Sequence, residues 1–290
     1  MRINLGDGLG GFVGTNELNG DGDPTRIAVR DLNNDGKLDL IANAPSEGKM
    51  LLYFGDGNGG FSNHATELEG LSNDYSFAVG DFNHDGNLDL AVIEFVGKGP
   101  TGTRVEIDLG DGAGNFTEKT RITVGEKAGD IILGDLNHDG NIDLIVGGAG
   151  PQNDTGLFVS TYLGDGTGNF TQKQVINLGP GTLEGEMALA DFNEDGNPDV
   201  AFPITFSQTD IQSTTVLLFS GDGTGNLMTG QPITVGQNPH TTLAADFNQD
   251  GHLDLAVSNR GDATMSILLG DGHGGFTTKA VLPVAVLPAP

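Results

Sequence analysis

One nine-residue acidic segment occurs five times along this chain, at intervals of about 50 to 56 residues. Each copy has aspartate at positions 1, 5 and 9, asparagine at position 3 and glycine at position 6. A unit that recurs at such a period predicts a repeat architecture, either a solenoid or a propeller. We call these segments acidic loops 1 to 5; they are residues 31–39, 81–89, 135–143, 191–199 and 246–254.

The residue types of the acidic loops are those that bind a hard cation. Oxygen side chains at alternate positions, with a glycine for the sharp turn, are typical of calcium loops. An EF-hand would add a glutamate at position 12 and flanking helices, but position 12 is apolar in all five copies. We therefore expect about five calcium ions, each in a β-hairpin loop. The expected ligands are the side chains of positions 1, 3, 5 and 9 and the backbone carbonyl of position 7: Asp31, Asn33, Asp35, Lys37, Asp39, Asp81, Asn83, Asp85, Asn87, Asp89, Asp135, Asn137, Asp139, Asn141, Asp143, Asp191, Asn193, Asp195, Asn197, Asp199, Asp246, Asn248, Asp250, His252 and Asp254.

The alternative interpretation is that the acidic loops are only turns, since Asp, Asn and Gly favour turns in any case. Three carboxylates within nine residues repel one another when no cation is present. Five matching copies therefore favour calcium. Position 4, which holds His84 and His138 in two copies, is expected to point to solvent. Pro198 stands at position 8 of acidic loop 4, where the other copies have Leu or Ile, and we expect that site to survive.

A second repeat, a Gly-Asp-Gly turn, alternates with the acidic loops. Glycine-rich turns of this kind supply the positive φ angles that tight hairpins need. No helix follows them, so they are not phosphate loops. We interpret them as hairpin turns with an anchoring Phe, and a supplementary calcium ligand from the aspartate is the alternative. The six copies are residues 5–12, 54–61, 109–116, 163–170, 220–227 and 269–276.

Short apolar and β-branched segments recur between the two kinds of turn and predict strands. In the second repeat unit these are residues 77–80, 88–93, 104–109 and 116–123. Four antiparallel strands with short connections form the blade of a β-propeller, and the fold class is all-β. Both kinds of turn then lie at the same end of each blade. We expect one domain over residues 1–290, with complete blades at about 25–67, 77–123, 130–178, 186–235 and 241–284 and an N-terminal half-blade hairpin at 2–19.

With both motifs in place, the chain resembles the FG-GAP/VCBS repeat propellers, a group that includes the integrin α N-terminal domain and certain fungal calcium-binding lectins. The resemblance covers roughly residues 2 to 285. Because such propellers usually have six or seven blades, it implies a ring of six positions or a fragment of a six- or seven-bladed ring. A half-built blade leaves open strand edges, so self-association through them is expected. In the integrin-like relatives the ligand face is opposite the calcium face.

Charge and composition exclude several classes of function. The net charge is −27 with only 13 Lys and Arg residues, which argues against binding nucleic acid. The absence of cysteine excludes thiol chemistry, and no apolar stretch is long enough for membrane insertion. The N-terminus lacks the apolar core of a leader peptide. Because loops of this kind suit millimolar external calcium, we expect an extracellular or cell-surface protein whose leader peptide is not in this sequence.

These observations predict a secreted or cell-surface adhesion or ligand-binding module in which calcium is structural. We expect no enzyme activity, no catalytic residue and no cofactor other than calcium. A protein or glycan ligand would bind the loops opposite the acidic loops, such as 94–103, 147–156 and 259–263, because variable loops on a rigid scaffold carry function. The absence of Trp argues modestly against a sugar. Two alternatives stay open: the propeller part of a calcium-dependent hydrolase or polysaccharide lyase, and a structural spacer of a larger surface protein.

Overall fold

The computed structural model describes residues 2–9, 11–18, 24–62, 66–69, 76–95, 102–125, 127–149, 156–179, 185–204 and 213–284. The chain divides into two compact units, and each is described by itself. Unit 1 comprises residues 1–98, 102–123 and 166–169, and unit 2 comprises residues 99–101, 124–165 and 170–290. The single domain expected over residues 1–290 stays a prediction.

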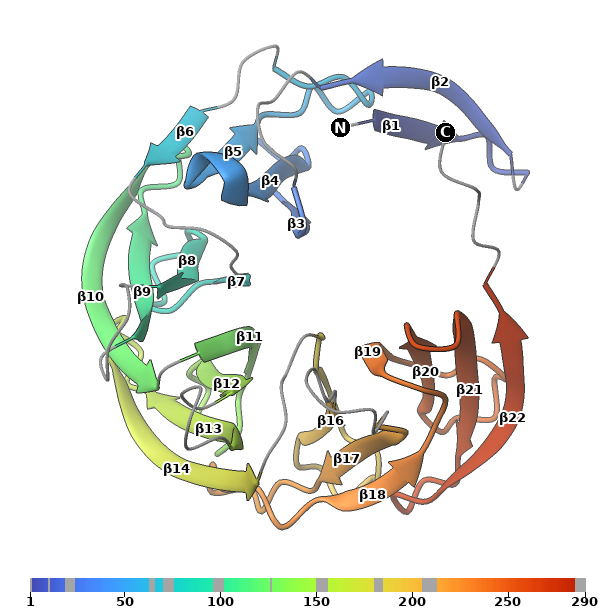
Figure 1. Ribbon diagram of the computed structural model, residues 1–290. Coiled ribbons are helices and arrows are strands. Elements are labelled where there is room, and N and C mark those ends of the chain that lie inside the picture. The colour runs from blue at the N-terminus through green and yellow to red at the C-terminus, as the bar shows by residue number, and fades with distance from the viewer. Residues whose placement is uncertain are drawn as a thin grey trace. The chain divides into compact units, whose positions relative to one another are not determined.

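Unit 1 contains a two-stranded hairpin and two four-stranded sheets, which are blades 1 and 2 (Figure 1). The sheet orders are β1-β2, β3-β4-β5-β6 and β10-β9-β8-β7, so chain neighbours pair within each sheet. The elements are β1 (Arg2–Gly6), β2 (Phe12–Glu17), β3 (Ile27–Arg30), β4 (Asp39–Ala44), the 3-10 helix η1 (Pro45–Glu47), β5 (Lys49–Tyr53), β6 (Thr66–Glu69), β7 (Phe77–Gly80), β8 (Asp89–Phe95), β9 (Thr103–Gly110) and β10 (Phe116–Gly125).

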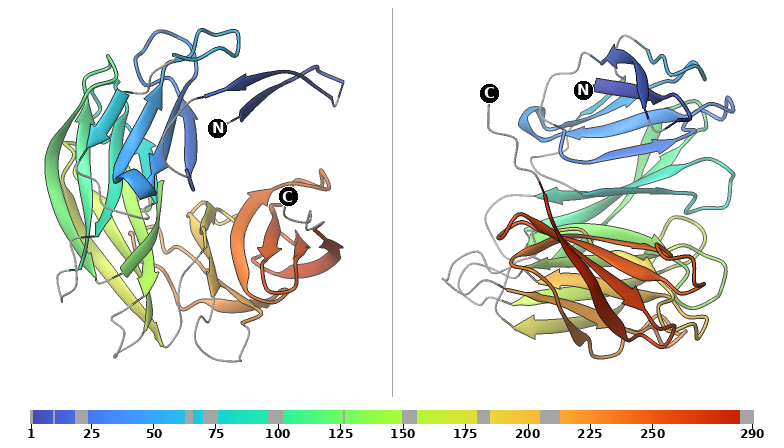
Figure 2. Two further views of the ribbon diagram at one scale, coloured as in Figure 1. Left: turned by 45° about the horizontal axis from the view of Figure 1, so that its top comes forward. Right: turned by 90° about the vertical axis from the view of Figure 1, so that its right-hand side faces the viewer.

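Unit 2 contains three four-stranded sheets, blades 3, 4 and 5, each again in chain order. The strands of blade 5 lie side by side in Figure 1 and in the right-hand view of Figure 2. The strands are β11 (Lys127–Gly134), β12 (Asp143–Ala149), β13 (Leu157–Gly164), β14 (Phe170–Gly179), β15 (Ala188–Ala190), β16 (Asp199–Ile204), β17 (Thr215–Phe219), β18 (Gln231–Thr234), β19 (Pro239–Ala245), β20 (Asp254–Asn259), β21 (Thr264–Gly270) and β22 (Phe276–Pro283).

The predicted fold class is confirmed: the chain is an all-β propeller protein with five four-stranded antiparallel blades and a small N-terminal hairpin sheet. Strand β7 has the predicted bounds, and β9 extends one residue beyond the prediction at each end. Each acidic loop connects the first and second strands of a blade. Five of the six Gly-Asp-Gly turns connect the third and fourth strands of a blade, and the first connects β1 and β2. How many blade positions the ring has stays a prediction.

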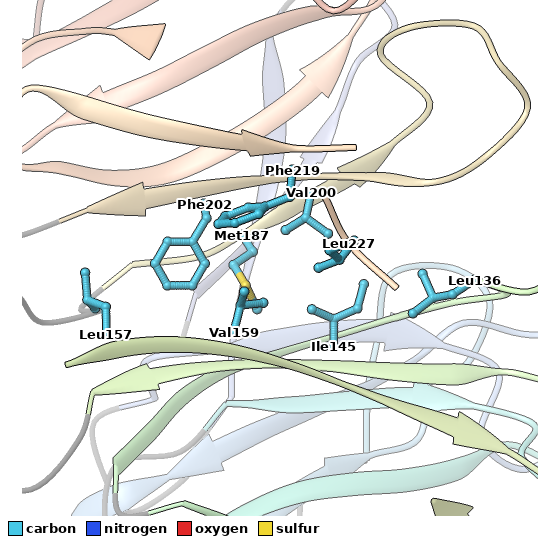
Figure 3. Packing of buried hydrophobic residues seen from close by; sticks show 9 residues of the cluster. All are labelled: Leu136, Ile145, Leu157, Val159, Met187, Val200, Phe202, Phe219 and Leu227. Atoms are coloured by element: carbon cyan, nitrogen blue, oxygen red, sulfur yellow. The ribbon is translucent and has the colours of Figure 1, made fainter. Parts of the chain in front are cut away.

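In blades 1 to 4 nearly every described residue of the second strand is buried, whereas in β20 of blade 5 Ala256 and Ser258 are only half-buried. In β16, Val200 and Phe202 join a cluster with residues of blade 3. The intervening Ala201 joins a different cluster with residues of blade 5. Successive side chains of a strand point to opposite faces, so one apolar strand serves two cores. Figure 3 shows the first of these cores, to which Ile145 and Val159 contribute from blade 3.

Candidate calcium loops

All five acidic loops have one hydrogen-bonded frame, which acidic loop 3 illustrates. The Oδ1 atom of Asp135 accepts the backbone N–H of Asp139 at 3.2 Å, and its Oδ2 atom accepts that of Gly140 at 3.0 Å. Asp139 Oδ1 in turn accepts the N–H of Asn141 at 2.8 Å. The equivalent bonds recur in the other four loops. The side-chain oxygens of positions 1 and 5 are therefore held in place by the backbone of their own loop.

Backbone strain at position 4 shows how tightly these loops turn. Position 4 has a positive φ in every copy although none is glycine: Asn34 at 56°, His84 at 58°, His138 at 60°, Glu194 at 58° and Gln249 at 62°. L-residues adopt this left-handed region at a cost, and such strain persists only where the surroundings fix the conformation.

The aspartate at position 9 connects the two turns of its blade. Asp143 is fully buried; its Oδ2 accepts the N–H of Leu136 at 2.8 Å and its Oδ1 that of Gly164 at 2.9 Å. Leu136 is position 2 of the same loop, and Gly164 is the first glycine of the Gly-Asp-Gly turn. The other four position-9 aspartates are also buried and make the same pair of bonds. Within each blade, therefore, both kinds of turn lie at the same end, as predicted.

The carboxylates of one loop repel one another. Burial, with a contribution from the charges of Asp195 and Asp191, raises the pKa of Asp199 to about 6. Burial and the corresponding neighbours also raise the pKa of Asp89 and of Asp143. In acidic loops 2, 3 and 4, positions 1 and 5 are therefore close enough to disfavour the charged form of position 9.

The donor set of each loop matches a hard cation, namely three carboxylates, an amide oxygen and a backbone carbonyl. Each carboxylate oxygen that accepts one N–H keeps a further acceptor site. Among the residues that the structure describes, no three His, Cys, Asp or Glu side chains lie close enough together to hold a metal ion as they stand. Because position 9 already accepts two backbone donors, positions 1, 3 and 5 are the more accessible ligands. The complete predicted ligand set stays a prediction.

Neighbouring loops contact each other through positions 4 and 7, which the sequence did not reveal. We expected position 4 to point only to solvent, but Asn34 Nδ2 donates to Asn87 Oδ1 at 2.8 Å. The Nε2 of His138 lies 3.0 Å from Oδ1 of Asn197. Between blades 4 and 5, the Nδ1 atom of His252 lies 2.5 Å from the Oε1 atom of Glu194. Nothing in the spacing signals these contacts, because the partners lie one repeat apart.

The Gly-Asp-Gly turns also join consecutive blades. The N–H of Gly225, in the turn of blade 4, donates to the carbonyl of Leu136 in acidic loop 3 at 3.2 Å. Gly168 donates to Phe82 in the same way. The aspartates of these turns accept N–H groups of their own turn, and for Asp56 the donors Asn58 and Gly60 lower the carboxyl pKa. This geometry supports the hairpin-turn interpretation.

Pro198 leaves the frame of acidic loop 4 intact. Asp199 keeps both of its backbone donors, at 3.0 Å each, and Asp191 keeps the N–H groups of Asp195 and Gly196. Position 8 contributes no hydrogen bond to the frame in the other loops either. Proline is therefore tolerated here, because its missing N–H has no role in the loop.

A partly buried cluster of acidic residues in blade 2, in which Glu106 and Asp108 are buried, is a feature that sequence reasoning missed. Arg121 makes ion pairs with Glu106 at 3.0 Å, Glu118 at 3.2 Å and Glu94 at 3.6 Å. Beside them, burial and the charges of Glu106 and Glu118 raise the pKa of Asp108 to about 7. Strand alternation could have placed Glu106 and Asp108 on one face, but only the pairing of β8, β9 and β10 gathers the whole cluster.

Only part of the predicted ligand-binding loops lies within the residues that the structure describes. Residues 96–101 and 150–155 lie outside the described residues. The loop at 259–263 is described, and it is tied to its neighbour: Arg260 donates to the carbonyl of Asn238 at 2.9 Å. The described residues contain no helix with the length and apolarity that crossing a membrane requires.

Crystal structures of three bacterial proteins are similar to this chain. A functionally unknown protein from Desulfotomaculum acetoxidans is 13% identical, with a TM-score of 0.62 over 97% of this chain and 76% of that one. A protein from Lactobacillus plantarum is 16% identical, with a TM-score of 0.62 over 90% and 71%. A Bacteroides fragilis protein described as a candidate 6-phosphogluconolactonase is 15% identical, with a TM-score of 0.65 over 98% and 78%. At these identities the likeness shows the fold alone.

A search of curated proteins finds no match to this chain. The sequence profile of the FG-GAP-like repeat matches residues 31–92, 135–202 and 205–257, which together make up more than half of the chain. The three matched segments contain all five acidic loops. With its blades and loops arranged as described, the chain belongs to the FG-GAP-like repeat family.

Proposed function

We propose that this protein is a secreted or cell-surface calcium-binding module, in which about five structural calcium ions stiffen a propeller that binds a ligand. The observation that carries the proposal is the shared frame of the five acidic loops, whose carboxylates are held together despite their repulsion. A divalent cation would supply the opposing charge that relieves this repulsion. The residues of acidic loop 3 that would hold it are Asp135, Asn137 and Asp139, with the carbonyl of Asn141.

Calcium in these loops would act on the fold rather than on a substrate. Each loop joins the first two strands of its blade, and position 9 ties it to the turn between the other two strands. Contacts such as His138 with Asn197 extend the connection to the next loop. Fixing one loop therefore restrains a whole blade and the adjoining edge of its neighbour. We infer a non-enzymatic role from this arrangement.

The ligand would bind at the opposite end of the blades, where the loops vary in length. We propose a protein or glycan partner, and the net charge of −27 favours one with a cationic surface. Five divalent ions would reduce that charge to about −17, which is still strongly acidic. We place the protein outside the cell because calcium is millimolar there and sites of modest affinity would be filled.

Calorimetric titration of the full chain, after dialysis against chelator, tests the calcium part of the proposal. We expect about five ions per chain for the wild type and about four for Asp139→Ala. The matched control is Asp111→Ala, which removes an exposed aspartate from a Gly-Asp-Gly turn and should keep about five. Equal stoichiometry for the two variants, or no binding by the wild type, would contradict the proposal.

A binding screen tests the ligand part. Labelled full chain is applied to protein and glycan arrays in about 2 mM calcium and again in chelator. A hit that requires calcium supports the binding module. Its loss in a variant of the loop at 259–263, with retention in Asp111→Ala, would locate the ligand face. Antibody labelling of intact source cells tests the location; labelling only after permeabilisation would contradict it.

A further inference from the structure

Acidic loop 1 differs from the other four at position 7, where it has a lysine. The residue there is Lys37 in acidic loop 1, asparagine in acidic loops 2 to 4 and His252 in acidic loop 5. Lys37 is the only Lys or Arg in the five acidic loops. With three aspartates and one lysine, acidic loop 1 has a formal charge of −2, whereas acidic loop 2, with three aspartates alone, has −3.

The side chain of position 7 lies over the Gly-Asp-Gly turn of its own blade. In blade 2, a methyl group placed on Gly112 would overlap the side chain of Asn87, and the same holds in blades 4 and 5. In blade 1, a methyl group on Gly57 would lie 3.3 Å from both Cγ and Cδ of Lys37. The apolar stem of the lysine therefore packs over the turn, and this contact keeps its ammonium group near the acidic loop.

The ammonium of Lys37 pairs with the position-5 carboxylate of its own loop. Its Nζ atom lies 3.2 Å from Oδ2 of Asp35, and the two side chains are 44% and 34% exposed. Although desolvation opposes it, hydrogen bonds from Lys37 and its charge lower the pKa of Asp35. In the turn, the backbone donors Asn58 and Gly60 lower the pKa of Asp56, and the charge of Lys37 adds to their effect. Lys37 thus brings positive charge to two carboxylates at this end of blade 1.

In acidic loops 2 to 5 the same carboxylate oxygen has a neutral partner. Oδ2 of Asp85 accepts the Nδ2 of Asn83 at 3.0 Å, and the equivalent bonds in acidic loops 3 to 5 measure 2.8 to 3.1 Å. An amide brings no net charge, so it does not offset the repulsion among the carboxylates. The backbone frame is nevertheless the same in acidic loop 1, where Asp31 accepts the N–H groups of Asp35 and Gly36. The loops differ here in the charge of one partner.

We propose that Lys37 is an internal cation that competes with calcium for acidic loop 1, so that this loop binds calcium more weakly than acidic loops 2 to 4 do. The inference rests on the calcium-binding function proposed above. Before Asp35 can bind calcium through Oδ2, the ammonium must leave that oxygen, and the stem over Gly57 keeps it close to the ion as a like charge. Calcium loops with fewer net negative charges bind the ion less tightly.

The weaker site would make blade 1 the part of the protein that responds to calcium at higher concentration. Acidic loop 1 joins β3 to β4, and Asp39 ties it to the next turn by accepting the N–H groups of Leu32 and Gly55. Calcium in this loop therefore restrains the whole blade. Acidic loops 2 to 4 would already be filled at concentrations where blade 1 still changes its stiffness.

Hydrogen exchange of the full chain, measured by mass spectrometry from about 1 μM to about 10 mM calcium, resolves the loops separately. In the wild type, the midpoint of protection for residues 31–39 should lie about three- to tenfold above that for residues 81–89. Lys37→Met keeps an apolar stem over Gly57 but has no charge, so it should lower the midpoint for residues 31–39 by about the same factor. Lys37→Arg keeps the charge and should behave like the wild type.

Two further measurements separate competition from a merely structural role of the lysine. In chelator, Lys37→Met should speed exchange in residues 31–39 by roughly two- to fivefold, because the empty loop loses its internal cation. Removing the charge therefore loosens the empty loop and yet strengthens calcium binding, whereas loss of a structural contact would weaken both. The difference in midpoint should also shrink between about 0.05 M and about 0.5 M salt, because exposed charges are screened.

The matched control is Lys279→Met, which removes an exposed lysine of β22 and changes the net charge equally. It should alter neither the midpoint nor the exchange in chelator. Equal midpoints for residues 31–39 and 81–89 in the wild type, no lowering by Lys37→Met, or an equal shift in Lys279→Met would overturn the inference and leave the calcium-binding function standing. Absence of calcium protection in every acidic loop would overturn both.

Discussion

The Nε2 atom of His138 lies 3.0 Å from the Oδ1 atom of Asn197, so position 4 of acidic loop 3 contacts position 7 of acidic loop 4. Asn34 with Asn87 and Glu194 with His252 repeat the relation in other pairs of blades. Position 7 is also the residue whose carbonyl we assign to calcium. The residue whose backbone carbonyl we propose as a calcium ligand therefore also contacts the preceding loop through its side chain, so an ion bound in one loop would influence its neighbour.

Removing this contact should make acidic loop 4 open more often, without changing the fold. In His138→Ala we expect amide exchange in residues 191–199 to rise by roughly two- to fivefold, while exchange in β12 is unchanged. Exchange monitored by mass spectrometry checks this. Asn58→Ala, an exposed residue in the Gly-Asp-Gly turn of blade 1, is the control and should have no effect on acidic loop 4.

Calcium should stabilise the protein against unfolding. At about 1 mM calcium and a site dissociation constant of about 0.1 mM, each ion adds about 1.4 kcal/mol by mass action. The melting temperature should therefore fall in chelator and recover when calcium is restored, with magnesium less effective. Thermal melts followed by circular dichroism make the comparison. A melting temperature that chelator does not move would exclude structural calcium.

The position-9 aspartate should contribute to the free energy of unfolding even without calcium, and it should contribute clearly more than the position-5 aspartate does. Asp143→Ala leaves the N–H groups of Leu136 and Gly164 without their acceptor, and we expect a loss of roughly 1–3 kcal/mol in chelator. Asp139→Ala, in the exposed part of the same loop, should cost clearly less in chelator. Urea unfolding of both variants, with and without calcium, separates the structural role of position 9 from ion binding. Equal losses in chelator would contradict this division.

Stability should also depend on pH through Asp108. Its folded pKa, about 7, lies above its usual value of 3.8, so the folded protein favours the protonated carboxyl. The contribution of Asp108 is therefore fully favourable below about pH 4, falls as the pH rises, and is lowest above about pH 7. Asp108→Asn should exceed the wild type in free energy of unfolding by roughly 1–3 kcal/mol at pH 8, and the difference should vanish near pH 4.

Urea unfolding at several pH values measures that difference, and subtraction of the wild-type curve cancels the titration of the acidic loops. Glu118→Gln serves as the control for a general loss of negative charge, because Glu118 is the more exposed member of the cluster. It should give a smaller gain at pH 8. A variant Asp108→Asn that is less stable than the wild type at pH 8 would contradict the assigned pKa.

Much of the fold could be predicted because its signals are local. The acidic loops and the Gly-Asp-Gly turns each lie within nine residues or fewer, and the strands between them are short apolar segments whose type does not depend on distant partners. For this reason the sequence predicts strand β7 with its observed bounds, Phe77–Gly80. The half-blade at the N-terminus is recognisable because its turn, at Asp7, shares the Gly-Asp-Gly-x-Gly pattern of the five others.

The sequence by itself determined the repeat, the strands, the antiparallel blade and the oxygen-rich chemistry of the loops, since turn residues and strand periodicity act over a few positions. Only the tertiary structure decided what those residues touch. Asp143 reaches Gly164 from 21 residues away, and His138 reaches Asn197 from 59 residues away. Such contacts depend on strand pairing and on the stacking of one blade on the next, and no local pattern encodes the partner.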